Sequence, residues 1–223
     1  MLLSDKILSY HFGLRPSVNL PKDIEWLLPY DDEETKRCMT LFYNRYYKDD
    51  HKRIFILGIN PGRFGAGITG VPFTDPVRLE ALGIENSFQK RQELSSVFIF
   101  DMIRECGGPD SFFSRYYIAS LSPLGFVKDG KNYNYYDDRA LGDAVRPFII
   151  RNIETQIHFG ADRDKVFCLG QGKNHDYLNK LNDEYQWWKE VIPLPHPRWI
   201  MQYRLKEKDK YLNVYKKEIA IHA

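Results

Sequence analysis

The sequence predicts a three-layer α/β/α domain around a central, mainly parallel sheet of four strands. Short apolar segments alternate with helical patterns along the chain, and each apolar segment ends at glycine, proline or a small polar residue. This alternation requires crossover connections, which make neighbouring strands parallel and cover both faces of the sheet. No repeat, low-complexity tract or flexible linker divides the 223 residues. We therefore expect a single domain over 1–223.

Each element is predicted from its local pattern. Short runs of apolar residues predict the strands 53–59, 116–120, 165–169 and 190–194. Longer amphipathic spacing and terminal signals predict the helices 31–47, 94–106, 137–159 and 205–221. Ligands of such sheets bind beyond the carboxyl ends of the strands. Those ends are followed here by glycine-rich or polar segments, which are 60–73, 120–126, 170–175 and 195–200.

Composition limits the class of protein only loosely. With 32 basic and 30 acidic residues the formal net charge is +2, which is too small to indicate nucleic-acid binding without a local patch. Basic residues gather between Arg198 and Lys217. This stretch either faces phosphates or forms a solvated helix.

Cysteine and histidine usage indicates a protein without a metal or cofactor. Cys38, Cys106 and Cys168 form no CxxC pair and cannot all be joined in disulfides, which favours a reducing compartment. The six histidines show no metal-ligand spacing. The first residues contain no long apolar run. We expect a cytoplasmic monomer that has no membrane contact.

The segment Gly58-Ile-Asn-Pro-Gly-Arg-Phe-Gly-Ala-Gly-Ile-Thr-Gly-Val-Pro-Phe73 is the most specific motif of the chain. Its five glycines and two prolines fix a backbone path around one asparagine and two phenylalanines. Glycine lets a flat ligand approach the main chain, and Phe73 offers a stacking face for a nucleobase. No GK[ST] ending follows, which argues against a nucleotide triphosphate loop. Phe64 is expected to be a core aromatic.

This segment resembles the first active-site motif of the SMUG-type (single-strand-selective monofunctional) uracil-DNA glycosylases, and the resemblance implies the fold of that superfamily and membership of a distinct bacterial branch. It implies that Asn60 positions the hydrolytic water and that Phe73 stacks on a base flipped out of DNA. Main-chain and side-chain groups of this loop then line the base pocket, and they come from Ile59, Gly62, Gly65 and Ala66.

Two further segments are similar to the same family. Pro195-His-Pro-Arg-Trp-Ile200 resembles its insertion loop, with His196 in place of the catalytic histidine. The alternative alignment puts Leu194 there and leaves no group to stabilise the departing base, so we prefer His196. The residue that fills the gap left in the DNA is then Arg198, Trp199 or Ile200.

The third segment holds Ser120 where the family has an asparagine that reads uracil. A hydroxyl discriminates that edge less strictly than an amide does, so hypoxanthine and xanthine become plausible substrates. After the third strand, Lys173 and His175 stand at a strand-to-helix turn where main-chain amides can bind a DNA phosphate. A helix-capping turn explains the same two residues equally well. The nearby Tyr133, Tyr135 and Tyr136 are expected to pack a surface loop.

These features predict a monofunctional glycosylase that hydrolyses the bond between sugar and deaminated base in DNA. Such a reaction needs a positioned water and a donor to the base, which Asn60 and His196 supply without a metal or cofactor. Two other interpretations remain open. The first is a non-catalytic nucleic-acid-binding module of the same fold, and the second is a hydrolase of free nucleosides or nucleotides.

Overall fold

The computed structural model describes residues 1–221. The central strands are β2 (Arg53–Gly58), β3 (Tyr116–Ser120), β6 (Ala161–Leu169) and β7 (Glu190–Leu194). Three shorter strands are β1 (Ile24–Leu27), β4 (Gly125–Lys128) and β5 (Lys131–Tyr133). The helices are α1 (Leu3–Gly13), α2 (Glu33–Tyr46), α3 (Ala66–Thr69), α4 (Pro76–Ala81), α5 (Leu94–Glu105), α6 (Gly108–Phe113), α7 (Arg139–Ile157), α8 (Lys173–Tyr185), α9 (Pro197–Tyr203), the 3₁₀ turn η1 (Leu205–Glu207) and α10 (Lys208–Ile221).

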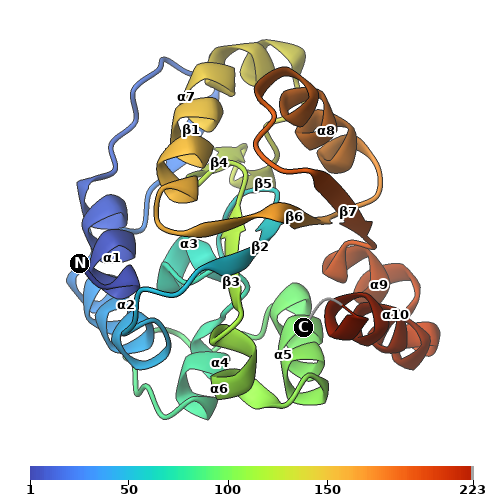
Figure 1. Ribbon diagram of the computed structural model, residues 1–223. Helices are drawn as coiled ribbons and strands as arrows, with labels where there is room; N and C mark the ends of the chain where they lie inside the picture. The colour runs from blue at the N-terminus through green and yellow to red at the C-terminus, as the bar shows by residue number, and fades with distance from the viewer. Residues whose placement is uncertain (222–223) are drawn as a thin grey trace.

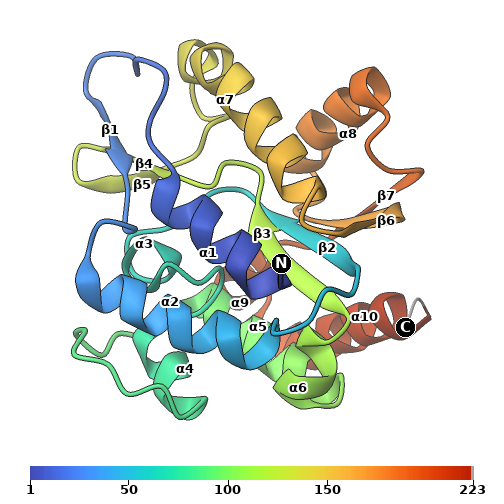
Figure 2. The same ribbon diagram turned by 60° about the vertical axis from the view of Figure 1, so that its left-hand side comes forward.

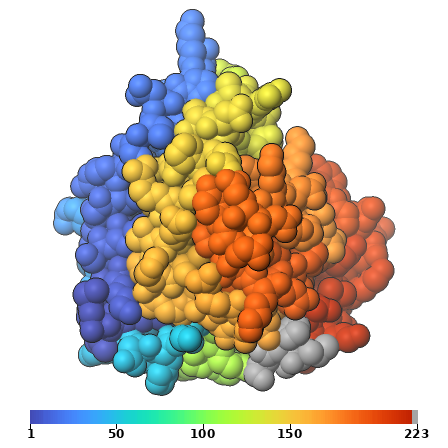
Figure 3. All heavy atoms as spheres, turned by 45° about the horizontal axis from the view of Figure 1, so that its top comes forward, coloured from blue at the N-terminus to red at the C-terminus, as the bar shows by residue number. Residues whose placement is uncertain are grey.

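The central sheet has four strands in the order β3-β2-β6-β7, and all neighbouring pairs are parallel. Helices α7 and α8 cover one face, and α5 and α10 lie on the other (Figures 1 and 2). Figure 3 shows α7 in yellow and α8 in orange, packed side by side over their face. The predicted three-layer α/β/α fold with a four-stranded parallel sheet is confirmed.

The strands end at one level, which brings their following loops together. Gly58 of β2 pairs with Ser120 of β3, and Leu169 of β6 pairs with Leu194 of β7. The connection from β2 leads to β3 on one side, and the connection from β3 crosses β2 to reach β6 on the other. Such a reversal opens a crevice beyond the strand ends, and the loop that begins with Asn60 lies at this point.

A small antiparallel sheet, in the order β1-β4-β5, was absent from the sequence prediction. Its hairpin between β4 and β5 turns at Asp129 and Gly130, which both have positive φ angles, 49° and 65°. Two such residues form the hairpin turn that fits twisted strands. The hairpin packs on the Asn-Pro-Gly turn so closely that a Cβ at Gly125 would lie 2.3 Å from the Pro61 carbonyl oxygen.

The hydrophobic core runs through the chain from Leu3 to Ile219 and contains the central strands. All three cysteines are free thiols. Within residues 1–221 no helix is long and apolar enough to span a membrane, and no three His, Cys, Asp or Glu side chains gather as metal ligands would.

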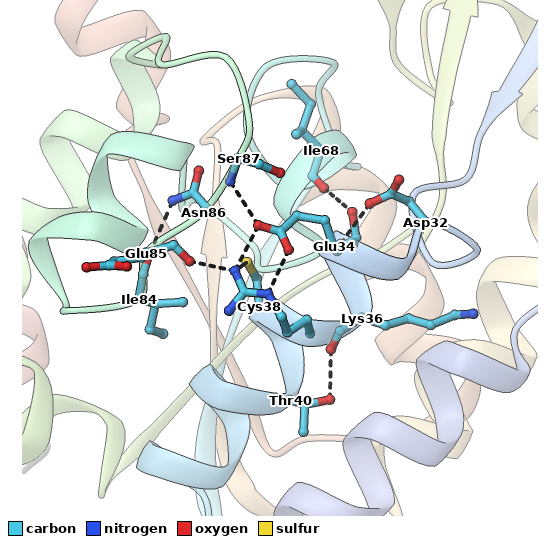
Figure 4. Close-up of polar contacts among 12 residues, drawn as sticks. Asp32, Glu34, Lys36, Cys38, Thr40, Ile68, Ile84, Glu85, Asn86 and Ser87 are labelled. Atoms are coloured by element: carbon cyan, nitrogen blue, oxygen red, sulfur yellow. Dashed lines mark hydrogen bonds and ion pairs between the residues drawn. The ribbon is translucent and has the colours of Figure 1, made fainter.

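The start of α2 is tied to the loop that follows α4 by a network around Glu34 (Figure 4). Its carboxylate accepts hydrogen bonds from the Arg37 guanidinium at 2.7 and 2.8 Å and from the Ser87 main-chain N–H at 2.8 Å. Arg37 also donates to the Glu85 carbonyl at 2.6 Å. These bonds fix the segment that leads from α4 into α5.

We expect Glu34→Gln to lower the free energy of unfolding by about 1 kcal/mol, because a charge-assisted pair and a main-chain donor lose their acceptor. The Arg37 hydrogen bonds, and then the Ser87 amide, lower the pKa of Glu34 to about 2. The stabilisation is therefore complete above pH 4.5 and lost as the pH falls toward 2. Urea unfolding measured between pH 7 and pH 2 tests this, with the exposed neighbour Glu33→Gln as control; a constant difference across this range would contradict the ionic explanation.

Candidate active site

A pocket of about 550 Å³ lies beyond the carboxyl ends of β2 and β3. Its walls come from every loop that the sequence analysis placed at this edge except the one after β6, which borders a neighbouring hollow of about 340 Å³. Of the predicted site residues, the pocket is lined by Asn60, His196, Ile59, Gly62, Ala66, Phe73, Ser120, Arg198 and Trp199. Segments more than a hundred residues apart in sequence thus form one cavity.

The side chain of Asn60 has a fixed orientation. Its Nδ2 donates to the Tyr133 carbonyl at 3.1 Å and to the Pro61 carbonyl at 3.4 Å. Because only the amino group of the amide can serve two carbonyl oxygens, Oδ1 must take the opposite position. Oδ1 is buried and makes no hydrogen bond within the described part of the chain. A buried acceptor without a partner requires a donor from a bound molecule.

His196 is held as a neutral donor. It is the N-cap residue of α9, and its Nδ1 accepts the Arg198 main-chain N–H at 3.1 Å. A ring nitrogen that accepts carries no proton, so the proton of the neutral imidazole is on Nε2. Burial, with a smaller effect of the Arg198 charge, lowers the pKa of His196 to about 4. Near pH 7 the ring therefore presents an uncharged Nε2–H.

Phe73 supplies an aromatic wall beside this donor, with 6.4 Å between the Phe73 and His196 ring centroids. Its φ angle of 53° is unusual for a residue with a side chain and marks a backbone held by its surroundings. The ring lies over Gly58, where a Cβ would come within 2.7 Å of two ring carbons. The Oγ of Ser120 faces the same glycine, 3.5 Å from that Cβ position, and makes no side-chain hydrogen bond in the described structure.

Gly65 does not line the pocket, although it belongs to the predicted loop. A Cβ at Gly65 would lie 2.0 Å from Oε2 of Glu93, so glycine permits this carboxyl group to pack over the loop. Glu93 itself lines the pocket. In this structure Gly65 therefore contributes to the pocket through Glu93, which packs over it.

The predicted insertion loop is the start of a helix, because Pro197 occupies its first turn, where proline is well tolerated. Arg198 is exposed at the pocket rim, and Trp199 is 38% exposed. Ile200, on the inner side of α9, is completely buried and does not line the pocket. Leu194, the alternative to His196, is likewise buried, in β7.

The turn before α8 lies in the neighbouring hollow. Lys173 is exposed there, with its Nζ 5.8 Å from the Tyr136 ring centroid. His175 lines neither cavity, and its Nε2 is paired with the Asn179 side chain at 3.0 Å. Only Lys173 of this predicted pair is thus placed near the pocket.

The basic C-terminal stretch divides into two parts. Lys208 forms an ion pair with Asp101, and Lys216 lies 3.5 Å from Glu105, so both lysines attach α10 to α5. Arg198 stays at the pocket rim together with the exposed Tyr203. Of this stretch, Arg198 therefore supplies the positive charge beside the pocket.

Sequence reasoning missed several residues of the pocket. They are Pro72, Glu93, Ser95, Asn132, Asn134, Tyr136, Gln202 and Tyr203. The prediction that the 133–136 tyrosines pack a surface loop was wrong. Tyr135 is completely buried, and its hydroxyl donates to Asn174 at 2.7 Å. Tyr136 borders both cavities.

Phe64 was also predicted wrongly as a core aromatic. It is only partly buried and lies outside the core cluster. The guanidinium carbons of Arg63 and Arg91 lie 5.0 and 3.6 Å from its ring centroid. Two cation–π contacts explain why this apolar ring is stable near the surface.

A parallel α/β sheet with an amide, a neutral imidazole and an aromatic ring around one base-sized cavity is the arrangement of a DNA glycosylase. The family model of the uracil DNA glycosylase superfamily matches residues 45–220, and the chain belongs to this superfamily. Its structure is similar to the crystal structure of wild-type Pedobacter heparinus SMUG2. The TM-score is 0.96 and the sequence identity 42%, over 99% of this chain and 98% of that one. The resemblance to SMUG-type enzymes read from the motifs is thereby confirmed.

Proposed function

We propose that this chain is a monofunctional glycosylase that flips uracil out of DNA and removes it by hydrolysis, and that it also accepts the deaminated purines hypoxanthine and xanthine. The proposal rests on one observation: two side chains of fixed orientation in this pocket have opposite hydrogen-bonding roles. Asn60 presents an acceptor without a partner, and His196 presents an uncharged donor, in the same pocket.

Each polarity matches one demand of the reaction. The bond between sugar and base breaks with its electron pair leaving on the base, while the sugar gains positive character. Asn60 Oδ1 accepts a hydrogen bond from the water that attacks the anomeric carbon, and this water releases its proton to solvent. His196 Nε2–H donates to the base carbonyl oxygen on which negative charge grows. Phe73 stacks on the base, and the Ser120 hydroxyl contacts its edge.

DNA is the expected partner because the rim of the pocket combines an exposed aromatic residue with positive charge. Trp199 and Arg198 project from the first turn of α9. One of them fills the gap left by the extruded nucleotide, and Lys173 contacts a phosphate. Among the described residues no lysine lines the pocket. Without an amine to form a Schiff base with the sugar, the enzyme leaves the sugar–phosphate chain intact.

An oligonucleotide with a single uracil tests the proposal. We expect release of uracil and an abasic site that breaks only after alkali treatment, with no release from free deoxyuridine. Hypoxanthine and xanthine in the same sequence measure the substrate range. Tight DNA binding without base release would select the non-catalytic module, and cleavage of deoxyuridine would select a nucleoside hydrolase.

A further inference from the structure

A polar niche lies behind Gly62, away from the groups to which a role has been given. A Cβ placed on Gly62 would lie 3.2 Å from Nδ2 of Asn132 and 3.2 Å from Oε1 of Glu93. The two side chains come from β5 and from the start of α5, and both line the pocket. Glycine at this position leaves the space between them open to a ligand.

The Asn132 amide is fixed with its donor toward the niche. Its Oδ1 accepts the Arg63 main-chain N–H at 3.0 Å. The amino group is therefore on the other side, beside Gly62, and forms no hydrogen bond to another described residue. A free pair of N–H donors faces the cavity.

Glu93 occupies the N-cap position of α5, but its side chain does not cap the helix. The carboxyl group instead turns over Gly65 and into the pocket, where no described residue hydrogen-bonds to it. Its main-chain N–H donates to the Asp75 carboxylate at 2.9 Å. A carboxyl group that leaves an available helix terminus and turns into a cavity without a hydrogen-bond partner is placed for a ligand.

The protonation state of Glu93 determines whether its carboxyl group can donate a hydrogen bond to a ligand. Burial is the main cause that raises the pKa of Glu93 to about 7, and the negative charge of Asp75 adds to it. The positive charge of Arg198 on α9 lowers this pKa and partly offsets the two. His196, which also lines the pocket, is uncharged near pH 7 because its pKa is lowered to about 4. Below pH 7 the niche thus contains two donors side by side, an amide N–H and a carboxylic O–H.

Two adjacent donors fit two adjacent acceptors. The O6 and N7 atoms of a 6-oxopurine form such a pair, and uracil has a single acceptor, O4, beside a C–H. We propose that Glu93 and Asn132 form a second base-reading element, in which Asn132 donates to O6 and Glu93 donates to N7 of hypoxanthine or xanthine. This inference rests on the proposed glycosylase function and assigns its purine range to two residues.

The element also acts during the reaction. When the bond to N9 breaks, negative charge spreads through the imidazole ring of the purine and reaches N7. A donor at N7 therefore strengthens its hydrogen bond as the charge grows, without transferring the proton. Loss of such a bond is expected to cost about ten- to a hundredfold in rate.

The test compares hypoxanthine and uracil excision from the same oligonucleotide under single-turnover conditions between pH 6 and pH 8. For the wild type, the hypoxanthine-to-uracil rate ratio is expected to fall about tenfold over this range, because Glu93 loses its proton. Glu93→Gln keeps an N–H donor that does not titrate, so the ratio becomes independent of pH. Asn132→Asp keeps the acceptor for Arg63 and loses the donor, so the ratio falls about tenfold at pH 6. Glu190→Gln, at an exposed carboxyl group on β7, is the control and behaves as the wild type.

The outcomes separate the two proposals. If the wild type removes uracil but not hypoxanthine, or if Glu93→Gln keeps the pH dependence of the wild type, the purine-reading element is wrong and uracil excision still stands. If the wild type releases neither base from DNA, the proposed function itself fails. Thermal unfolding of each variant separates a loss of fold from a change of the rate ratio.

Discussion

Asn60→Ala is expected to lower single-turnover excision of uracil about a hundred- to a thousandfold. The variant removes the Oδ1 acceptor that positions the attacking water. It also removes the Nδ2 bonds to Tyr133 and Pro61 that orient the amide. Binding of uracil-containing DNA should change little, because the aromatic and basic groups of the rim remain.

An aspartate at this position provides a sharper version of the test. Asn60→Asp keeps an oxygen for the water, but it places a carboxylate oxygen where Nδ2 now meets two carbonyl oxygens. The repulsion rotates the side chain or raises its pKa. We therefore expect no gain over the wild type, even though a carboxylate is the stronger base. Asn213→Ala on the exposed face of α10 is the control; full excision by Asn60→Ala would disprove the water-positioning role.

The carboxyl ends of the strands could be predicted because they depend on short-range pattern. Segments such as Tyr116–Ser120 and Glu190–Leu194 are apolar, short and bounded by turns, and their predicted bounds match the structure. Parallel pairing then follows from the helices between them. The pattern of strands and helices thus places Asn60 and His196 at one edge of the sheet.

The hairpin of β4 and β5 carried a signal that the sequence analysis did not use. An Asp-Gly pair such as Asp129-Gly130, flanked by segments in which hydrophobic residues alternate with others, is a strong signal of a β-hairpin. The hairpin brings Asn132 to the pocket and the Tyr133 carbonyl to Asn60. Its docking on the Pro61 turn is a tertiary contact between distant segments, and no local pattern indicates such a contact.

Glu93 was not predictable from its surroundings in the sequence. An acidic residue directly before an apolar helix is typical of a capping residue. Its actual direction, over Gly65 and into the pocket, accompanies a tertiary contact in which its main-chain N–H donates to the Asp75 carboxylate. Ile200 was likewise expected beside the DNA, but Pro197 starts a helix in which this side chain turns inward.

His196→Ala is expected to reduce uracil excision about a hundred- to a thousandfold, because one donor to the departing base is lost. The structure predicts that the donor is neutral. The pKa of His196 is lowered to about 4, so its contribution to activity is constant between pH 5 and pH 8. An imidazolium donor would instead lose activity as the pH rises through 6.5. Nitrogen NMR of labelled histidine, read for a proton on Nε2 at pH 7, checks the tautomer directly.

The same pKa determines how stability responds to acid. A folded-state pKa below the ordinary 6.5 means that folding favours the neutral ring, so the contribution of His196 is complete above pH 6.5 and is lost as the pH falls toward 4. Protonation of Nδ1 would also remove the acceptor of the Arg198 amide and loosen the first turn of α9. The difference in unfolding free energy between His196→Ala and the wild type should therefore change between pH 7 and pH 4. His51→Ala, at an exposed histidine, should show no comparable change, and a protonated His196 ring at pH 7 would refute the assigned role.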